Sequence, residues 1–162
     1  MNGTILTLGV YGYDADAFER AILDAKPDIV VDIRRRRGVR GARYSFANST
    51  RLQNMLAKNA IPYIHRIDLA TPEAVMKREG EIDRAEHIAR HERDHLSDDF
   101  ISDYTESVLK HFIATEFIAS LGDDISRVVL LCVERTANAC HRGLLAAEIV
   151  HQLGWDRVDL EA

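Results

Sequence analysis

The chain has 162 residues, of which 46% are hydrophobic and 29% charged, a composition typical of one ordinary globular domain. It contains no apolar run of about 18 residues or more and no basic N-terminal segment ahead of an apolar stretch, so we expect neither a membrane span nor a signal peptide. Two cysteines are too few for a disulfide framework and predict a cytoplasmic protein, while the net charge of −5 argues against a protein that coats nucleic acid.

The first half of the chain alternates between predicted strands and helices. An apolar run at 4–8 predicts a first strand, and apolar residues at helical spacing predict a helix over 15–25. The β-branched residues at 29–33 predict a second strand, which a helix at 50–58 and a third strand at 61–67 follow. Strands that alternate with helices over short connections imply a parallel sheet with right-handed crossovers.

The second half begins with a charged segment at 72–98 that is poor in large apolar residues. We expect this segment to form one or two exposed helices inserted into the domain. An amphipathic pattern predicts one long helix over 99–121, and a fourth strand at 127–133, a helix after Cys140 and a short strand at 157–160 complete the pattern. We therefore predict a single three-layer α/β domain over the whole chain, with a mostly parallel sheet of about five strands and helices on both faces.

Polar and reactive residues collect where the predicted strands end. In an open parallel sheet, ligands bind in the crevice beyond the carboxyl ends of the strands. The residues that we expect to form one polar pocket there are Tyr11, Asp32, Arg34, His65, Glu134, Cys140, His141 and Arg142.

Three strand ends also carry short motifs. Val31–Arg34 reads Val-Asp-Ile-Arg, Ile61–His65 reads Ile-Pro-Tyr-Ile-His, and Leu131–Glu134 reads Leu-Cys-Val-Glu ahead of Cys-His-Arg at Cys140–Arg142. With these motifs the chain resembles, over nearly its full length, the family known as domain of unknown function 488. The resemblance implies a small cytoplasmic α/β protein with a shared pocket, and it implies no particular reaction because the family is named for the lack of one.

The first functional hypothesis is a pocket for a phosphate-bearing ligand, such as a nucleotide or a nucleic-acid end. Arg142 lies at a predicted helix start, where free amide groups and the helix dipole favour an anion, and Arg34 opens an arginine-rich loop. His65 and Glu134 would position or activate the reacting group, and Asp32 would brace Arg34. A structural ion pair at the rim of the sheet is the alternative interpretation of Asp32 and Arg34.

The second hypothesis is a thiol-dependent enzyme. Cys140 would be the nucleophile, because a helix start and nearby positive charge favour the thiolate, and His141 or His65 would be the base. The third hypothesis is a protein-interaction module that docks a partner through 72–98. A structural role for Cys140, as a small residue at the start of a helix, remains open at this point.

Two groups of residues have the types of side chain that bind metals. His87, His91 and His95 are four residues apart and would line one side of a helix, where two histidines can share a metal, but their neighbours suggest an exposed face. A zinc site of Cys132, Cys140, His141 and His65 is conceivable, although its spacing matches no standard zinc finger and Cys132 reads as a core residue. No glycine-rich phosphate motif opens a helix after a strand, and the sequence leaves the identity of any cofactor unknown.

Overall fold

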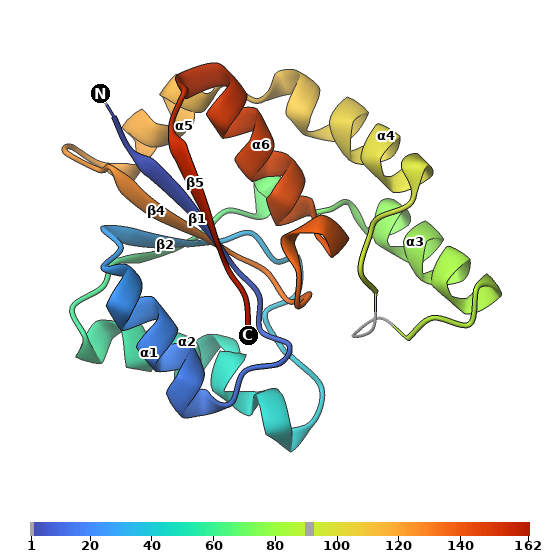
Figure 1. Cartoon of the computed structure of the whole chain (residues 1–162), viewed down its shortest axis with the longest axis horizontal. Helices are drawn as coiled ribbons and strands as arrows, with labels where there is room; N and C mark the ends of the chain where they lie inside the picture. Colours follow the sequence, from blue (N-terminus) through green and yellow to red (C-terminus); the bar gives the residue numbers. More distant parts are fainter. Residues whose placement is uncertain (1, 90–92) are drawn as a thin grey trace.

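A five-stranded parallel sheet forms the middle layer of the molecule, which the computed structural model describes over residues 2–89 and 93–162 (Figure 1). The strands are β1 (Thr4–Leu8), β2 (Ile29–Asp32), β3 (Tyr63–His65), β4 (Arg127–Leu131) and β5 (Asp156–Leu160). Their order across the sheet is β3-β2-β4-β1-β5, and every neighbouring pair is parallel. The middle strand β4 is buried from Val128 to Leu131 because helices cover both faces of the sheet.

Helices α1 (Ala15–Ala25) and α2 (Ser49–Lys58) cover one face. Phe18 of α1 and Leu52 of α2 are buried and share one core cluster with residues of β1 and β4. Between β2 and α2 the chain forms the short 3₁₀ helix η1 (Ala42–Ala47).

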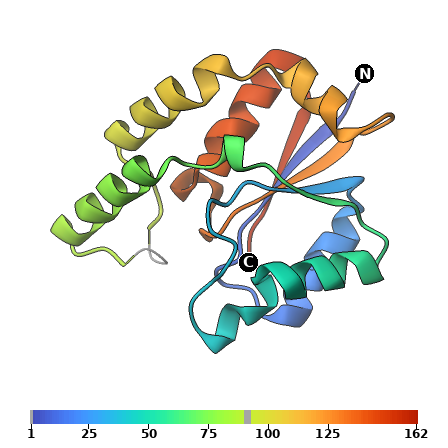
Figure 2. The same cartoon turned by 180° about the vertical axis from the view of Figure 1, so that it is seen from behind.

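The other face is covered by a second group of helices, in which α3 and α4 lie side by side at the outer edge (Figure 2). These helices are α3 (Glu73–Ala85), α4 (Asp98–Ser107), α5 (Ala114–Leu121) and α6 (His141–Leu153). Tyr104 of α4, Phe117 of α5 and Ile149 of α6 share a second core cluster with the sheet. The predicted three-layer α/β fold is thereby confirmed. Within the part of the chain that the structure describes, no helix is long and apolar enough to cross a membrane.

The single long helix predicted over 99–121 is wrong. The chain instead forms α4 and α5, separated by the 3₁₀ helix η4 (Leu109–His111) and a short extended stretch. The backbone N–H of Ala114 donates to Oε1 of Gln152 at 2.7 Å, and Nε2 of Gln152 donates to the carbonyl oxygen of Phe112 at 3.0 Å. A side chain of α6 therefore satisfies backbone groups that the break leaves without helical partners.

Several strand boundaries also differ from the prediction. The strands expected at 29–33 and 127–133 end at Asp32 and Leu131, and the strand expected at 61–67 is confined to β3. The backbone hydrogen bonding continues for one residue past β2 and β4, where the N–H of Ile33 donates to the carbonyl oxygen of Leu131 and that of Cys132 to the carbonyl oxygen of Leu8.

The charged segment 72–98 forms α3 and the connection to α4. Its helix is not exposed on all sides, because Val75, Glu79 and Asp83 are buried. These residues are four positions apart and therefore share one face of the helix. That face looks onto the carboxyl edge of the sheet, where Glu79 and Asp83 line a cavity.

Candidate functional site

A cavity of about 610 Å³ opens at the carboxyl edge of the sheet, between the ends of β1, β2 and β4 and the helix α3. The predicted pocket residues that line it are Tyr11, Arg34, Glu134, Cys140 and His141. The predicted residues Asp32, His65 and Arg142 are not part of the lining, but each hydrogen-bonds to Arg34 or Glu134, which are. The fold thus brings residues from four strand ends to one region.

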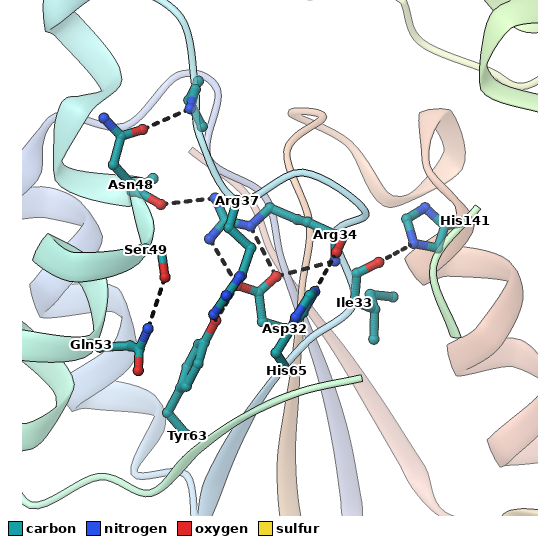
Figure 3. Close-up of polar contacts among 12 residues, drawn as sticks. Asp32, Ile33, Arg34, Arg37, Asn48, Ser49, Gln53, Tyr63, His65 and His141 are labelled. Carbon is teal, nitrogen blue, oxygen red and sulfur yellow. Dashed lines mark hydrogen bonds and ion pairs between the residues drawn. The ribbon is translucent and has the colours of Figure 1, made fainter. Parts of the chain in front are cut away.

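Asp32 and Arg34 form a buried ion pair in the wall of the cavity (Figure 3). Nε and Nη2 of Arg34 donate to the two carboxylate oxygens of Asp32 at 2.9 and 2.8 Å, and Nη1 donates to the carbonyl oxygen of Ala47 at 2.8 Å. Burial opposes the charge on Arg34, yet the hydrogen bond and charge of Asp32 raise the pKa of Arg34 above its ordinary value. Every nitrogen of this guanidinium has a protein partner, so Arg34 holds the loop after β2 in place.

Tyr63 completes this group from β3. Its hydroxyl donates to Oδ2 of Asp32 at 2.6 Å. Burial, together with this hydrogen bond to a carboxylate, raises the pKa of Tyr63 to about 12. The hydroxyl therefore stays protonated and keeps its donor role at neutral pH.

His65, also from β3, supports the same loop. Its Nε2 lies 2.7 Å from the carbonyl oxygen of Arg34. A carbonyl oxygen can only accept, so Nε2 is the donor in this contact. The side chain is half-buried behind the cavity wall and orients the backbone of Arg34. The acid or base role expected for His65 stays a prediction.

Arg142 is completely buried at the start of α6. Its Nη1 donates to the carbonyl oxygen of Glu134 at 2.7 Å and its Nη2 to that of Arg135 at 3.3 Å. The loop after β4 also approaches Gly9 so closely that a Cβ atom there would lie 1.9 Å from the carbonyl oxygen of Glu134. Arg142 and Gly9 together therefore determine where the Glu134 loop runs.

Cys132, Cys140 and His141 converge at the floor of the cavity. Nδ1 of His141 lies 3.7 Å from Sγ of Cys132 and 3.6 Å from Sγ of Cys140. On the opposite side of the ring, Nε2 lies 2.9 Å from the carbonyl oxygen of Ile33 (Figure 3). All three side chains are buried, and both cysteines are free. Cys132 is a core residue, as expected, and it also lines the cavity.

The charges at this floor favour a thiolate on Cys140. Burial alone would raise the pKa of Cys140, but the hydrogen bond from Cys132 and the positive charges of His141 and Arg142 hold that pKa well below its ordinary value. Burial and the neighbouring Cys140 hold the pKa of Cys132 well above its ordinary value. Burial opposes a charge on His141, yet the contact with Cys140 raises the pKa of His141.

A set of buried charged residues that sequence reasoning missed forms the wall opposite this floor. Arg93 donates through Nε to Oδ2 of Asp83 at 3.0 Å, and its Nη1 lies 3.8 Å from Oε1 of Glu134. Glu79 accepts hydrogen bonds from the hydroxyl of Ser97 at 2.5 Å and from its backbone N–H at 3.2 Å. The signal that could have identified this wall is the four-residue spacing of Glu79 and Asp83 within the charged segment.

Two of the histidines considered for a metal site, His87 and His95, do not lie in a helix. Helix α3 ends at Ala85, and His87 follows with a positive φ of 58°. His95 is exposed, with Nδ1 2.6 Å from Oδ1 of Asp94, and His91 lies outside the described residues. Among the described residues, the group whose ligand atoms lie within 4.8 Å of one another is Cys132, Cys140 and His141.

Comparison with known proteins leads to one family. No curated protein and no solved structure matches the chain. The family model described as "Domain of unknown function DUF488" matches residues 14–149, which include every strand except β1 and β5 and the whole floor of the cavity. This match covers more than half of the chain and agrees with the strand-end motifs. The chain therefore belongs to the family of domain of unknown function DUF488.

Proposed function

We propose that the protein binds a phosphate-bearing ligand in the cavity at the carboxyl edge of the sheet. The observation that carries this proposal is the charge of the lining. Its arginines are Arg34, Arg35, Arg36, Arg40, Arg84 and Arg93, and its carboxylates are Glu79, Asp83 and Glu134. Six positive side chains stand against three negative ones in the described lining. Once the buried Asp32 that neutralises Arg34 is counted, a surplus of two positive charges remains, which favours an anion.

The arginines that would contact the phosphate differ from those expected from the sequence. All three guanidinium nitrogens of Arg34 have protein partners, and Arg142, with partners for Nη1 and Nη2, does not line the cavity. Arg36 and Arg40, in contrast, are exposed and reach the cavity. Arg36 pairs with Glu73 at 3.2 Å, but both side chains are mostly exposed, so a phosphate can compete for this arginine. Arg35 donates to the backbone of Thr71 through Nε. The arginine-rich loop, more than the start of α6, would therefore hold the anion.

A nucleotide or a nucleic-acid end fits this cavity better than a duplex does. The volume of about 610 Å³ lies within the range of about 300–1,000 Å³ that is typical of small-ligand sites. Tyr11 lines the cavity, and the centroid of its ring lies 5.1 Å from that of Tyr44. The ring of Tyr11, which packs against Tyr44, offers a surface on which a base can stack.

The test compares nucleotides and inorganic pyrophosphate as ligands of the full chain in a thermal-shift and calorimetry experiment. At least one should raise the melting temperature, and the double variant Arg36→Ala/Arg40→Ala should weaken its binding by about tenfold or more, because a hydrogen bond to a charged group contributes about 1.5–3 kcal/mol. Arg20→Ala removes an exposed positive charge from α1 and should leave binding unchanged. The proposal is wrong if none of these anions binds, or if all variants bind equally.

A thiol-dependent reaction is the second candidate, and the contact between Cys140 and His141 favours it. A nucleophilic thiolate needs a base within reach, and Nδ1 of His141 lies 3.6 Å from Sγ of Cys140 inside the same cavity. Iodoacetamide should then modify Cys140 of the metal-free protein much faster than Cys132. Equal and slow modification of the two thiols would argue against a nucleophilic role for Cys140.

A further inference from the structure

We propose that Cys132, Cys140 and His141 bind a zinc ion at the floor of the cavity. The existence of this site stands on its own geometry. Its purpose, to act on the ligand held by the arginines, rests on the function proposed above.

The first argument is the spacing of the ligand atoms. With Zn–S bonds of about 2.3 Å and Zn–N bonds of about 2.0–2.1 Å meeting at a tetrahedral angle, sulfur and nitrogen ligands lie about 3.6 Å apart. Nδ1 of His141 lies 3.7 Å from Sγ of Cys132 and 3.6 Å from Sγ of Cys140. Both distances from the nitrogen to sulfur therefore match those of a zinc site, and all three ligand atoms lie within 4.8 Å of one another.

The second argument is the orientation of the imidazole ring. Nε2 of His141 lies 2.9 Å from the carbonyl oxygen of Ile33, which can only accept a hydrogen bond (Figure 3). Nε2 must then carry a proton, and in the neutral ring the lone pair is on Nδ1, which faces both sulfur atoms. Metal-binding histidines are commonly oriented in this way by a carbonyl oxygen on the other ring nitrogen.

The third argument is the presence of two cysteines. A nucleophilic cysteine needs one thiol and one base, so that role leaves unexplained why a second Sγ lies at nearly the same distance from the same nitrogen. Two thiolates and a neutral imidazole balance the charge of Zn²⁺, which lowers the cost of burying the ion. Thiolate ligands also favour zinc over magnesium or calcium.

The fourth coordination position would face the cavity, because Cys132, Cys140 and His141 all line it. Zinc sites with three protein ligands and an open position are typically catalytic, since the ion lowers the pKa of a bound water. Oε2 of Glu134 lies 3.9 Å from Sγ of Cys132, and Glu134 also lines the cavity.

The test measures metal binding by the untagged full-length chain. Elemental analysis should find about one zinc per chain after dialysis, and Co²⁺ added to metal-free protein should give a thiolate-to-cobalt charge-transfer band with d–d bands of tetrahedral intensity. Cys132→Ser and Cys140→Ser should each abolish the charge-transfer band or strongly weaken it. The double variant His87→Gln/His95→Gln removes surface histidines only and should retain both the zinc and the spectrum.

Because the cysteine variants can fail to fold, a measurement on the unmodified chain accompanies them. Zinc should protect both Cys132 and Cys140 from iodoacetamide, as read by mass spectrometry, and magnesium should not. The absence of retained zinc, of a cobalt spectrum and of protection would overturn the proposal, as would zinc binding that is lost only in the histidine double variant. Anion binding is measured separately on metal-free protein with the arginine variants, so the metal site and the anion site can fail independently.

Discussion

Strands β2 and β4 are neighbours and end at the same edge of the sheet, yet the polar residues that follow them are used differently. After β2, the side chains of Asp32 and Arg34 satisfy each other, and Ala47 and Tyr63 take up their remaining hydrogen-bonding capacity. After β4, Cys132 and Glu134 face a cavity.

The difference shows how a buried polar group can be assigned to stability or to chemistry. A charge whose partners all come from the protein gains little from a ligand, and losing one of those partners is costly. Thiols and an imidazole nitrogen that lie close together at the floor of a cavity can still bind a metal or a substrate. We therefore assign the β2 end to the frame of the site and the β4 end to its reactive floor.

The largest expected effect is on stability, and it tests the buried ion pair of Asp32 and Arg34 at the end of β2. Asp32→Ala would leave Arg34 buried without its carboxylate partner, and we expect the free energy of unfolding to fall by about 3–5 kcal/mol. Denaturant titration measures this loss. Asp68→Ala is the control, because its ion pair with Arg66 has the same 2.8 Å distance but is more exposed, so its loss should stay below about 1 kcal/mol. Similar losses in both variants would show that the buried ion pair of Asp32 and Arg34 stabilises the fold no more than the exposed pair of Asp68 and Arg66 does.

The effect of zinc on stability tests whether the end of β4 forms a metal site. At a free zinc concentration of about 100 times the dissociation constant, the metal should raise the free energy of unfolding by about 2.7 kcal/mol, and a chelator should reverse this rise. Cys140→Ser should remove the response to zinc. An equal rise with magnesium would indicate unspecific binding of cations and contradict the thiolate site.

The contact between the end of β1 and the loop after β4 can be disturbed at Gly9. A Cβ atom there would lie 1.9 Å from the carbonyl oxygen of Glu134, so Gly9→Ala forces the loop after β4 to move. We expect a loss of about 1–3 kcal/mol in the free energy of unfolding and weaker cobalt binding. Gly38→Ala is the matched control, because a Cβ atom there has no neighbour within 4 Å. Unchanged cobalt binding in Gly9→Ala would show that the close approach of Gly9 to Glu134 does not affect the metal site.

The smallest expected effect lies at the opposite edge of the sheet, at the amino end of β4. Asp28 accepts hydrogen bonds from the backbone N–H groups of Ser126 and Arg127, each at 2.8 Å. The bond from Ser126 is the main cause that holds the pKa of Asp28 below its ordinary value. Because the folded-state pKa is lower than the unfolded one, the carboxylate stabilises the fold above the ordinary pKa, and this stabilisation disappears as the pH falls through the folded-state pKa.

Asp28→Asn should therefore lower stability at neutral pH and flatten the decline of stability in acid. Chemical denaturation across a series of acidic pH values measures this slope. The exposed Asp24, changed to Asn in the same way, should leave the slope nearly as it is. A slope in Asp28→Asn that equals that of the unmodified chain would show that Asp28 contributes no pH dependence.

The sequence by itself determined the sheet and the region of the site. The apolar runs of β1 and β4 and the β-branched run of β2 have the short-range pattern of strands buried on both faces, and parallel strands place their carboxyl ends at one edge. For this reason the placing of Tyr11, Arg34 and Glu134 around one cavity was predictable from strand boundaries alone.

Only the tertiary structure decided which residues in that region are occupied and which are available. Arg34 and Arg142 have the same sequence signal as a phosphate clamp, and only the structure shows that Arg34 pairs with Asp32 and that Arg142 donates to the carbonyl oxygen of Glu134. The break between α4 and α5 likewise depends on Gln152, a residue of another helix. Strand patterns arise from neighbours along the chain, whereas these roles depend on partners that are distant in sequence, and local periodicity carries no information about them.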